Sequence, residues 1–405
     1  MKRIIFLNRY FPPDHSATSQ ILGDLAFHLA ARGREVHVVA SRQLYDQPQA
    51  RLPAAETVEG VQIHRVATTR LGRTRLLGRA LDYLSFAAAI RRAVLAIAAP
   101  GDILVAKTDP PLLCVVALRV ARQRDLHLVN WLQDLYPEVA ARLGVPLAGG
   151  ALGAGLMRLR DVALREAAAN IAVGDGMARI VCSRGVSPER VHVIPNWCDD
   201  EQIRPLPSSV NPLRRKWGLE DRFVVGYSGN LGRAHEFDTL LAAAERLRDR
   251  PNILFLFIGG GSKFDDLIRA VGQRRLSRSF RFVPYQDRGL LGFSLTVPDV
   301  HWLSLLPRVE GLMLPSKLYG IAAAGRPLVA VTARDGEIAG LVRRYECGVV
   351  VESGEGDDLA AELSGLADDP AQVAAMGSRA RQMLEANFTR RQAFERWRSV
   401  LDAIG

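Results

Sequence analysis

Residues 223–250 read FVVGYSGNLGRAHEFDTLLAAAERLRDR and decide the fold class of this chain. The apolar run Phe223–Tyr227 predicts a buried strand, and Gly229 and Gly232 predict a turn directly after it. A helix is expected over Phe237–Arg250. A strand that leads through a glycine turn into a helix is the repeating unit of a parallel α/β sheet.

The same unit recurs in both directions from this stretch. In the first half, strands are predicted at Ile4–Leu7, Val36–Ala40, Val61–Val66, Ile103–Ala106, Leu126–Trp131, Asn170–Val173 and Val191–Pro195. In the second half they continue at Ile253–Ile258, Phe280–Val283, His301–Leu305, Leu328–Val331 and Gly348–Val351. Helices are expected over Ser19–Arg32, Pro370–Asn387 and Arg390–Ala403. Because the strands are apolar throughout, each sheet should be buried on both faces.

The length and the linker composition predict two domains. At 405 residues the chain exceeds one ordinary hydrophobic core. The segment 199–211 is polar and carries Pro205 and Pro207, which is typical of a linker between domains. We therefore expect one doubly wound α/β domain over residues 1–200 and a second over 201–385. A last helix over 386–405 is expected to pack back on the N-terminal domain.

The charge of the chain points to an acidic partner. A net charge of +10 and a pI of about 9.8 favour nucleic acid, an anionic membrane or a phosphorylated ligand, although a general bias toward arginine would give the same excess. Aromatic residues at the spacing of RNA-binding motifs are absent, so nucleic acid is disfavoured. The chain contains four cysteines and no C-x-x-C pair, which disfavours a zinc site or a redox dithiol and favours a reducing compartment.

The location of the protein is expected to be cytoplasmic. The apolar run Ile4–Leu7 is too short for a signal peptide, and the sequence has no apolar stretch of membrane-spanning length. Arginines interleave with leucines over 65–92, at Arg70, Arg73, Arg75, Arg79, Arg91 and Arg92. A basic, amphipathic helix pair there would contact an anionic membrane surface, the inner face of the plasma membrane. An ordinary exposed helix face is the alternative.

The turn after Phe223–Tyr227 has the character of a phosphate site. Gly229 and Gly232 allow the backbone to approach a ligand, and Arg233 adds a cation suited to phosphate oxygens. Glycines 259–261 occupy the equivalent position after the next strand, but they do not form G-x-G-x-x-G because Phe264 stands at the last glycine. A nicotinamide enzyme is therefore disfavoured.

The stretch Glu310–Gly320, EGLMLPSKLYG, supplies a second ligand signal. Pro315 and Ser316 predict a helix start with Ser316 as the cap, which puts Lys317 in the first turn. A cation there opposes the helix dipole, and an anionic ligand such as a diphosphate would compensate that cost. A solvated lysine is the alternative.

Four motifs together carry a family resemblance. They are FPP at 11–13, HVIPNWCD at 192–199, YSGNLG at 227–232 and EGLMLPSKLY at 310–319. Over essentially the whole chain they resemble family 4 retaining glycosyltransferases, closest to bacterial enzymes of cell-surface polysaccharide assembly. The resemblance implies the GT-B fold, in which two Rossmann-like domains face a crevice.

The same resemblance implies the reaction. A hexosyl or N-acetylhexosaminyl group would move, with retention, from a nucleotide diphosphate sugar, expected to be UDP-linked, to a hydroxyl of a glycan or lipid-linked acceptor. No cofactor and no compulsory metal are expected. Gly229 and Asn230 would face the diphosphate, Lys317 would contact it ionically, and Glu310 would bind donor sugar hydroxyls. The remaining donor-binding positions are Gly260, Ser316, Leu318, Arg233 and Glu337.

This chain departs from the family pattern in two ways. The usual arginine and lysine of the first loop read Asn230 and His235 here, so Arg233 and Lys317 are expected to supply the positive charge. The second glutamate, which normally binds the ribose, reads Leu318 or Gly320, and Glu337 is a weak substitute.

Acceptor chemistry is expected from the first half. Asp134, in WLQDLYPE at 131–138, follows a strand, where a carboxylate facing a hydroxyl nucleophile can accept its proton. A helix cap or loop carboxylate is the alternative. His15 and Ser16, in the loop after the first strand, are predicted to bind the acceptor, and His15 is an alternative base.

Two rival functions remain at this stage. A non-hydrolysing nucleotide-sugar 2-epimerase would share the fold but would need several acid or base groups near the sugar. A non-catalytic nucleotide-sugar-binding protein is the other, prompted by the two departures.

Overall fold

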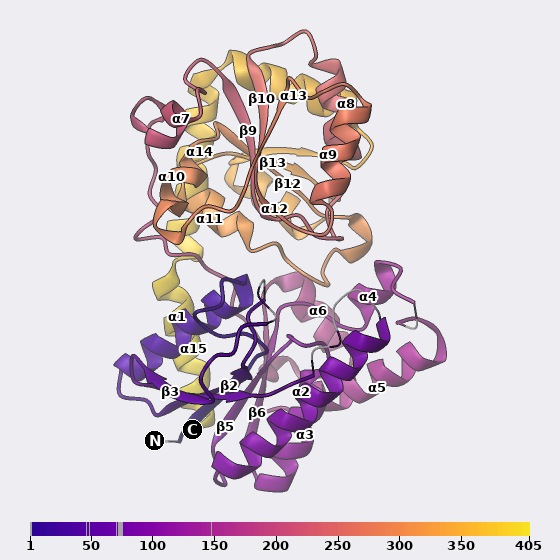
Figure 1. The fold of residues 1–405 in the computed structure, drawn as a ribbon, viewed down its shortest axis with the longest axis vertical. Helices are drawn as coiled ribbons and strands as arrows, with labels where there is room; N and C mark the ends of the chain where they lie inside the picture. The colour runs from indigo at the N-terminus through magenta and orange to yellow at the C-terminus, as the bar shows by residue number, and fades with distance from the viewer. Residues whose placement is uncertain (1, 46, 48, 70, 72–75, 147) are drawn as a thin grey trace. The chain divides into compact units, whose positions relative to one another are not determined.

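The computed structural model describes residues 2–45, 47, 49–69, 71, 76–146 and 148–405. They fall into two units, Met1–Pro195 with Ala393–Gly405, and Asn196–Gln392. Each unit is built on its own largely parallel sheet with helices packed on both faces (Figure 1).

Among the described residues, the first unit has eight strands in the order β3-β4-β2-β1-β5-β6-β7-β8. They are β1 (Ile4–Leu7), β2 (Val36–Ser41), β3 (Ala55–Val58), β4 (Val61–Val66), β5 (Ile103–Lys107), β6 (His127–Leu132), β7 (Ala169–Ala172) and β8 (Val191–Val193). The helices are α1 (Ala17–Ala31), α2 (Leu76–Ile97), α3 (Leu113–Arg124), α4 (Glu138–Arg142), α5 (Gly150–Glu166), α6 (Asp175–Ser183) and most of α15 (Arg390–Ile404). Trp397 of α15 lies against Trp131 of β6, with ring centroids 4.6 Å apart.

Residues 196–392, all of which are described, form six parallel strands in the order β11-β10-β9-β12-β13-β14. They are β9 (Phe223–Asn230), β10 (Ile253–Gly260), β11 (Phe280–Val283), β12 (Val300–Ser304), β13 (Leu328–Val331) and β14 (Gly348–Val351). The helices are α7 (Pro212–Lys216), α8 (Asp238–Arg246), α9 (Phe264–Gln273), α10 (Leu291–Thr296), α11 (Lys317–Ala323), α12 (Glu337–Tyr345), α13 (Gly356–Asp368) and α14 (Pro370–Asn387).

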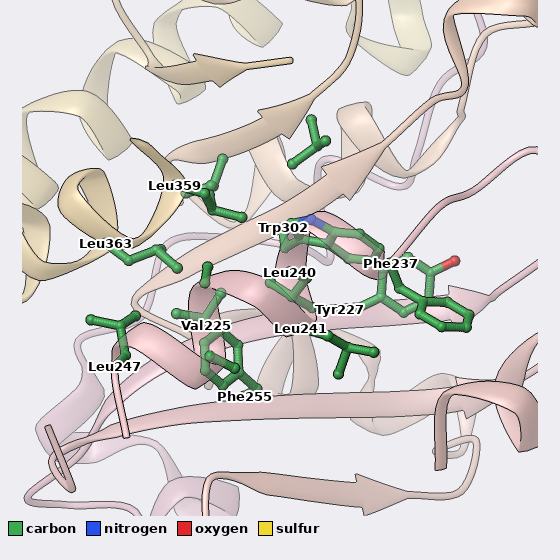
Figure 2. Packing of buried hydrophobic residues seen from close by; sticks show 14 of the residues in the cluster. Val225, Tyr227, Phe237, Leu240, Leu241, Leu247, Phe255, Trp302, Leu359 and Leu363 are labelled. Carbon is green, nitrogen blue, oxygen red and sulfur yellow. The ribbon is translucent and has the colours of Figure 1, made fainter. Parts of the chain in front are cut away.

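Side chains of β9 alternate between the two faces of this sheet. Val225 and Tyr227 pack with leucines of α8 and α13 in the larger core (Figure 2). Val224 points to the other face and packs with Leu213 of α7. Both faces are therefore buried, which explains the uninterrupted apolar strands. The prediction of two doubly wound α/β domains is confirmed.

The predicted helix pair over 65–92 is wrong. Arg65 lies in β4, where its buried guanidinium pairs with Glu56 and donates to the Pro12 carbonyl oxygen at 2.7 Å. A single helix, α2, covers the described end of the span. Arg70, Arg73 and Arg75 lie outside the described residues, as does the side chain of Arg79.

In the described part of the chain, no helix combines the length and the apolar character needed to cross a bilayer.

Candidate functional site

The donor residues predicted from sequence gather at the carboxyl edge of the second sheet. Strand β9 ends at Asn230 and pairs in register with β10, which ends at Gly260. The loop that follows β12 leads into α11, whose first residue is Lys317. Ligands of doubly wound folds bind at this edge, so the arrangement is that of a ligand site.

The side chain of Lys317 passes directly over Gly229. A Cβ atom added to Gly229 would lie 2.9 Å from the Lys317 Cε, and Gly229 has φ of +122°, where residues with side chains are strained. The Lys317 Nζ donates to the Asn230 carbonyl oxygen at 3.2 Å and lies 5.3 Å from the centroid of the Tyr227 ring. The absence of a side chain at Gly229 therefore makes room for the lysine.

The charge of Lys317 is not neutralised by any carboxylate among the described residues. In the part of the chain that the structure describes, no carboxylate forms an ion pair with this ammonium, and burial lowers its pKa to about 8. A cation held in a partly desolvated position without an opposite charge favours the binding of an anion.

Tyr227 and His235 are buried beside Lys317, and their two rings pack against each other. The Tyr227 hydroxyl donates to the Asn230 carbonyl oxygen at 2.7 Å, the same oxygen that Lys317 contacts. His235 is buried, and its Nδ1 donates to the Ser304 carbonyl oxygen at 2.6 Å. Burial and, to a smaller extent, the Lys317 charge lower the His235 pKa to about 3, so the ring is neutral at physiological pH. Sequence reasoning missed Tyr227, which gave no signal beyond ending an apolar run.

Glu310 and Glu337 meet at the start of α12. The Glu310 Oε1 accepts the backbone N–H of Glu337 at 2.7 Å, and the Thr332 hydroxyl lies 3.5 Å from the other oxygen, Oε2. Burial raises the pKa of Glu310, whereas the Glu337 N–H lowers it. The helix start thus fixes the orientation of the Glu310 carboxylate.

The remaining predicted donor residues differ in their setting. Ser316 stands at the N-cap position of α11 as expected, but its side chain makes no capping hydrogen bond, so that part of the prediction is wrong. Leu318 is fully buried. Arg233 is exposed on the loop before α8, which begins only at Asp238.

A second group of polar residues lies at the carboxyl edge of the first sheet. The Arg9 N–H donates to the Asp109 carbonyl oxygen at 2.8 Å, which joins the loops after β1 and β5. The Gln133 N–H donates to the Thr108 hydroxyl oxygen at 3.2 Å, which joins the loops after β5 and β6. Asp134 follows in the latter loop. Burial and the Asp109 charge together raise the Asp134 pKa to about 6, against the opposing effect of the Lys107 charge.

His15 and Ser16 belong to the loop between β1 and α1. The Asp14 carboxylate accepts the Ser16 N–H at 2.8 Å, and His15 is exposed. The Ser16 hydroxyl is buried and has no hydrogen-bond partner among the described residues. These side chains lie on the same unit and the same sheet edge as Asp134.

No group of three or more histidine, cysteine, aspartate or glutamate side chains is arranged to hold a metal ion in the described part of the chain. The four cysteines are free.

Two domain families match the sequence. The Glycosyl transferase 4-like domain matches residues 17–197, and Glycosyl transferases group 1 matches residues 209–383. The first match corresponds to the sheet with Asp134 and the second to the sheet with Lys317.

Similar proteins carry related names. A protein of Escherichia coli named as a colanic acid biosynthesis glycosyl transferase, WcaI, is 27% identical over 340 residues, which cover 80% of this chain and 81% of that protein. A Pseudomonas aeruginosa protein named as a glycosyltransferase, WbjE, is 24% identical and covers 81% of each chain. The crystal structure of Anabaena HepE in complex with UDP superposes with a TM-score of 0.73 at 17% identity, over 99% of this chain and 100% of that one. Together the two domain matches extend over most of the sequence, and the chain belongs to the glycosyltransferases of the GT-B fold, family 4 type.

Proposed function

We propose that this enzyme transfers a sugar from a UDP-linked donor to a hydroxyl of a glycan or lipid-linked acceptor in surface polysaccharide synthesis, with retention of configuration. The observation that carries the donor assignment is the Lys317 ammonium, which crosses Gly229 without a carboxylate counterion among the described residues. A diphosphate supplies the missing negative charge.

The donor would use three kinds of contact. The diphosphate lies against the backbone of Gly229 and Asn230, with Lys317 and the exposed Arg233 as its cations. This electrostatic arrangement stabilises the charge that grows on the diphosphate as it leaves. The Glu310 carboxylate, oriented by the α12 start, accepts hydrogen bonds from donor sugar hydroxyls. The proposal requires no metal.

Two lines support the UDP donor and the polysaccharide role. HepE was crystallised with UDP and with UDP-glucose. The names of WcaI and of WaaG, another structure with the same fold, refer to colanic acid and lipopolysaccharide biosynthesis.

On the acceptor side, Asp134 accepts the proton of the attacking hydroxyl, and His15 and Ser16 contact the acceptor.

The enzyme would reach a membrane-bound acceptor at the surface of the bilayer. Helix α2 exposes Leu81 and Leu84, and it presents Arg91 and Arg92 about two to three turns later. Apolar and basic side chains on one helix suit the interface of an anionic bilayer. We therefore place the enzyme peripherally at the cytoplasmic face of the plasma membrane.

The epimerase alternative is not favoured, because both matched domain families are glycosyltransferases. The non-catalytic alternative is separated from the proposal by turnover, measured as UDP release from UDP-sugars.

Ligand binding should be visible as a thermal shift. UDP at 100 times its Kd is expected to stabilise the second unit by about 2.7 kcal/mol. That corresponds to a rise in Tm of roughly 5–10 °C for a unit of this size. The measurement is a thermal melt with UDP, UDP-glucose, UDP-galactose and UDP-N-acetylglucosamine, with GDP as the comparison. No shift with any of the uridine compounds would contradict the proposed donor.

Gly229→Ala is expected to raise the Kd for UDP about tenfold, which is about 1.4 kcal/mol. The new methyl group would displace the Lys317 side chain from its position over the turn. Isothermal titration calorimetry measures the change. Gly340→Ala is the matched control, because a Cβ there meets nothing within 4 Å. Equal UDP affinities for the two variants would show that the turn does not face the diphosphate.

A further inference from the structure

Lys107, the last residue of β5, is buried at the carboxyl edge of the first sheet. Its side chain is 1% exposed, and its Nζ donates to the Thr18 carbonyl oxygen of α1 at 2.9 Å. The same nitrogen lies 4.0 Å from the centroid of the Trp131 ring. Burying an ammonium is costly, and neither a carbonyl nor a ring neutralises its charge. A role in packing alone would be filled better by methionine.

The charged groups that interact with Lys107 come from two loops. Asp109 follows it on its own loop, and Asp134 follows the neighbouring strand β6. The group of α1 that contacts the ammonium is an uncharged carbonyl, and the group of β6 that contacts it is the Trp131 ring. Burial lowers the Lys107 pKa to about 7, against the opposing effect of the two carboxylates. Lys107 and Asp134 therefore titrate in neighbouring pH ranges and influence each other.

We propose that Lys107 is a positioning residue for Asp134: its buried ammonium, held in place by the Thr18 carbonyl oxygen and the Trp131 ring, favours the charged form of the carboxylate that faces the acceptor hydroxyl. This inference rests on the proposed function. In the transfer step, the acceptor oxygen forms the new bond to the anomeric carbon while the bond from that carbon to the diphosphate oxygen breaks. The diphosphate leaves with the electron pair, and the hydroxyl proton passes to Asp134. Lys107 takes no part in bond making.

The coupling can be measured without turnover. The chain contains five lysines, so lysine labelled with ¹³C at Cε gives five NMR signals, and the signal lost in Lys107→Arg identifies Lys107. Its pKa is expected to fall in Asp134→Asn, because a negative charge that favours the ammonium is removed. An unchanged Lys107 titration in Asp134→Asn overturns the inference, whether or not the enzyme turns over.

The pH profile provides the functional readout. UDP release from the UDP-sugar with the largest thermal shift is followed with water as the acceptor. In Lys107→Met the acidic limb of kcat/KM is expected to move up by about one pH unit, because Asp134 loses a neighbouring positive charge. Lys107→Arg should restore the limb, and the exposed Lys216→Met should not move it.

The outcomes separate the two claims. If Lys107→Met lowers activity but leaves the acidic limb where it is, Lys107 is structural and the inference is wrong. If the wild-type enzyme releases no UDP from any UDP-sugar, the proposed function is contradicted, while the NMR titration still tests the coupling of Lys107 to Asp134.

Discussion

Lys317→Ala is expected to lower kcat for UDP release by about 10²–10³-fold, the usual cost of losing one preorganised charge stabiliser. The wild-type ammonium lies beside the turn where the proposal puts the diphosphate. The fold should survive, because the Tyr227 hydroxyl still donates to the Asn230 carbonyl oxygen that Lys317 leaves. Steady-state kinetics together with a thermal melt test both statements.

Lys216→Ala is the control for this variant, since that lysine is exposed at the end of α7. An activity of Lys317→Ala within about threefold of wild type would remove Lys317 from the mechanism, since such a factor is well under 1.4 kcal/mol.

Lys317 also predicts a pH dependence. Burial lowers its pKa to about 8, so the free enzyme carries the charge below that pH and loses it above. The value of kcat/KM for the donor should therefore decline as the pH rises through about 8. Lys317→Arg, whose side chain stays protonated, should lack this decline.

Asp299→Ala is expected to reduce the free energy of unfolding by about 3–5 kcal/mol, because it leaves a buried guanidinium without its counterion. Arg214 is 4% exposed and donates to both carboxylate oxygens of Asp299, at 3.0 and 3.1 Å. Asp299 also accepts the Val224 N–H at 2.7 Å, which ties the start of β9 to this pair. The substitution thus removes the hydrogen bond to the start of β9 as well as the charge partner of Arg214.

Urea denaturation measures this loss of stability, and the loss caused by breaking an exposed ion pair serves as the comparison. Arg246 and Asp357 form a pair in which both side chains are more than two-thirds exposed. Asp357→Ala is therefore expected to cost less than about 1 kcal/mol. Similar losses for the Asp357 and Asp299 variants would show that the buried pair is no stronger than a surface pair.

The strands could be predicted from sequence because nearly all of them are short, largely apolar runs with few exposed side chains. Ile4–Leu7, Phe280–Val283 and Gly348–Val351 have the predicted bounds. The exception is β3, whose sequence AETV is mostly exposed and pairs antiparallel with β4 at the sheet edge. An edge strand with one partner and a solvated face needs no apolar pattern, so the sequence carries no signal for it.

Residues of the candidate site could be predicted from sequence only where they belong to a short local motif. Gly229 and Lys317 could be predicted as candidate site residues because a glycine turn and a lysine at a helix start are local patterns. Lys107 was missed, because its hydrogen-bond partner Thr18 is 89 residues away and only the order of strands brings them together. Tyr227 was missed because its hydroxyl serves a backbone carbonyl that no pattern marks. The predicted side-chain cap at Ser316 is absent because the Ser316 backbone is already helical, with φ −65° and ψ −15°, whereas a capping residue needs an extended backbone.

The neutral ring of His235 has a consequence for the end of the catalytic cycle. A lysine in its place would add a second fixed cation beneath the diphosphate, whereas this imidazole is committed to the Ser304 carbonyl oxygen and carries no charge. If UDP binds as proposed, we expect it to be held with less electrostatic energy, and to depart more readily, than from a site with a lysine at position 235. Since product release limits the turnover of many enzymes, the neutral ring is expected to reduce product inhibition at some cost in donor affinity.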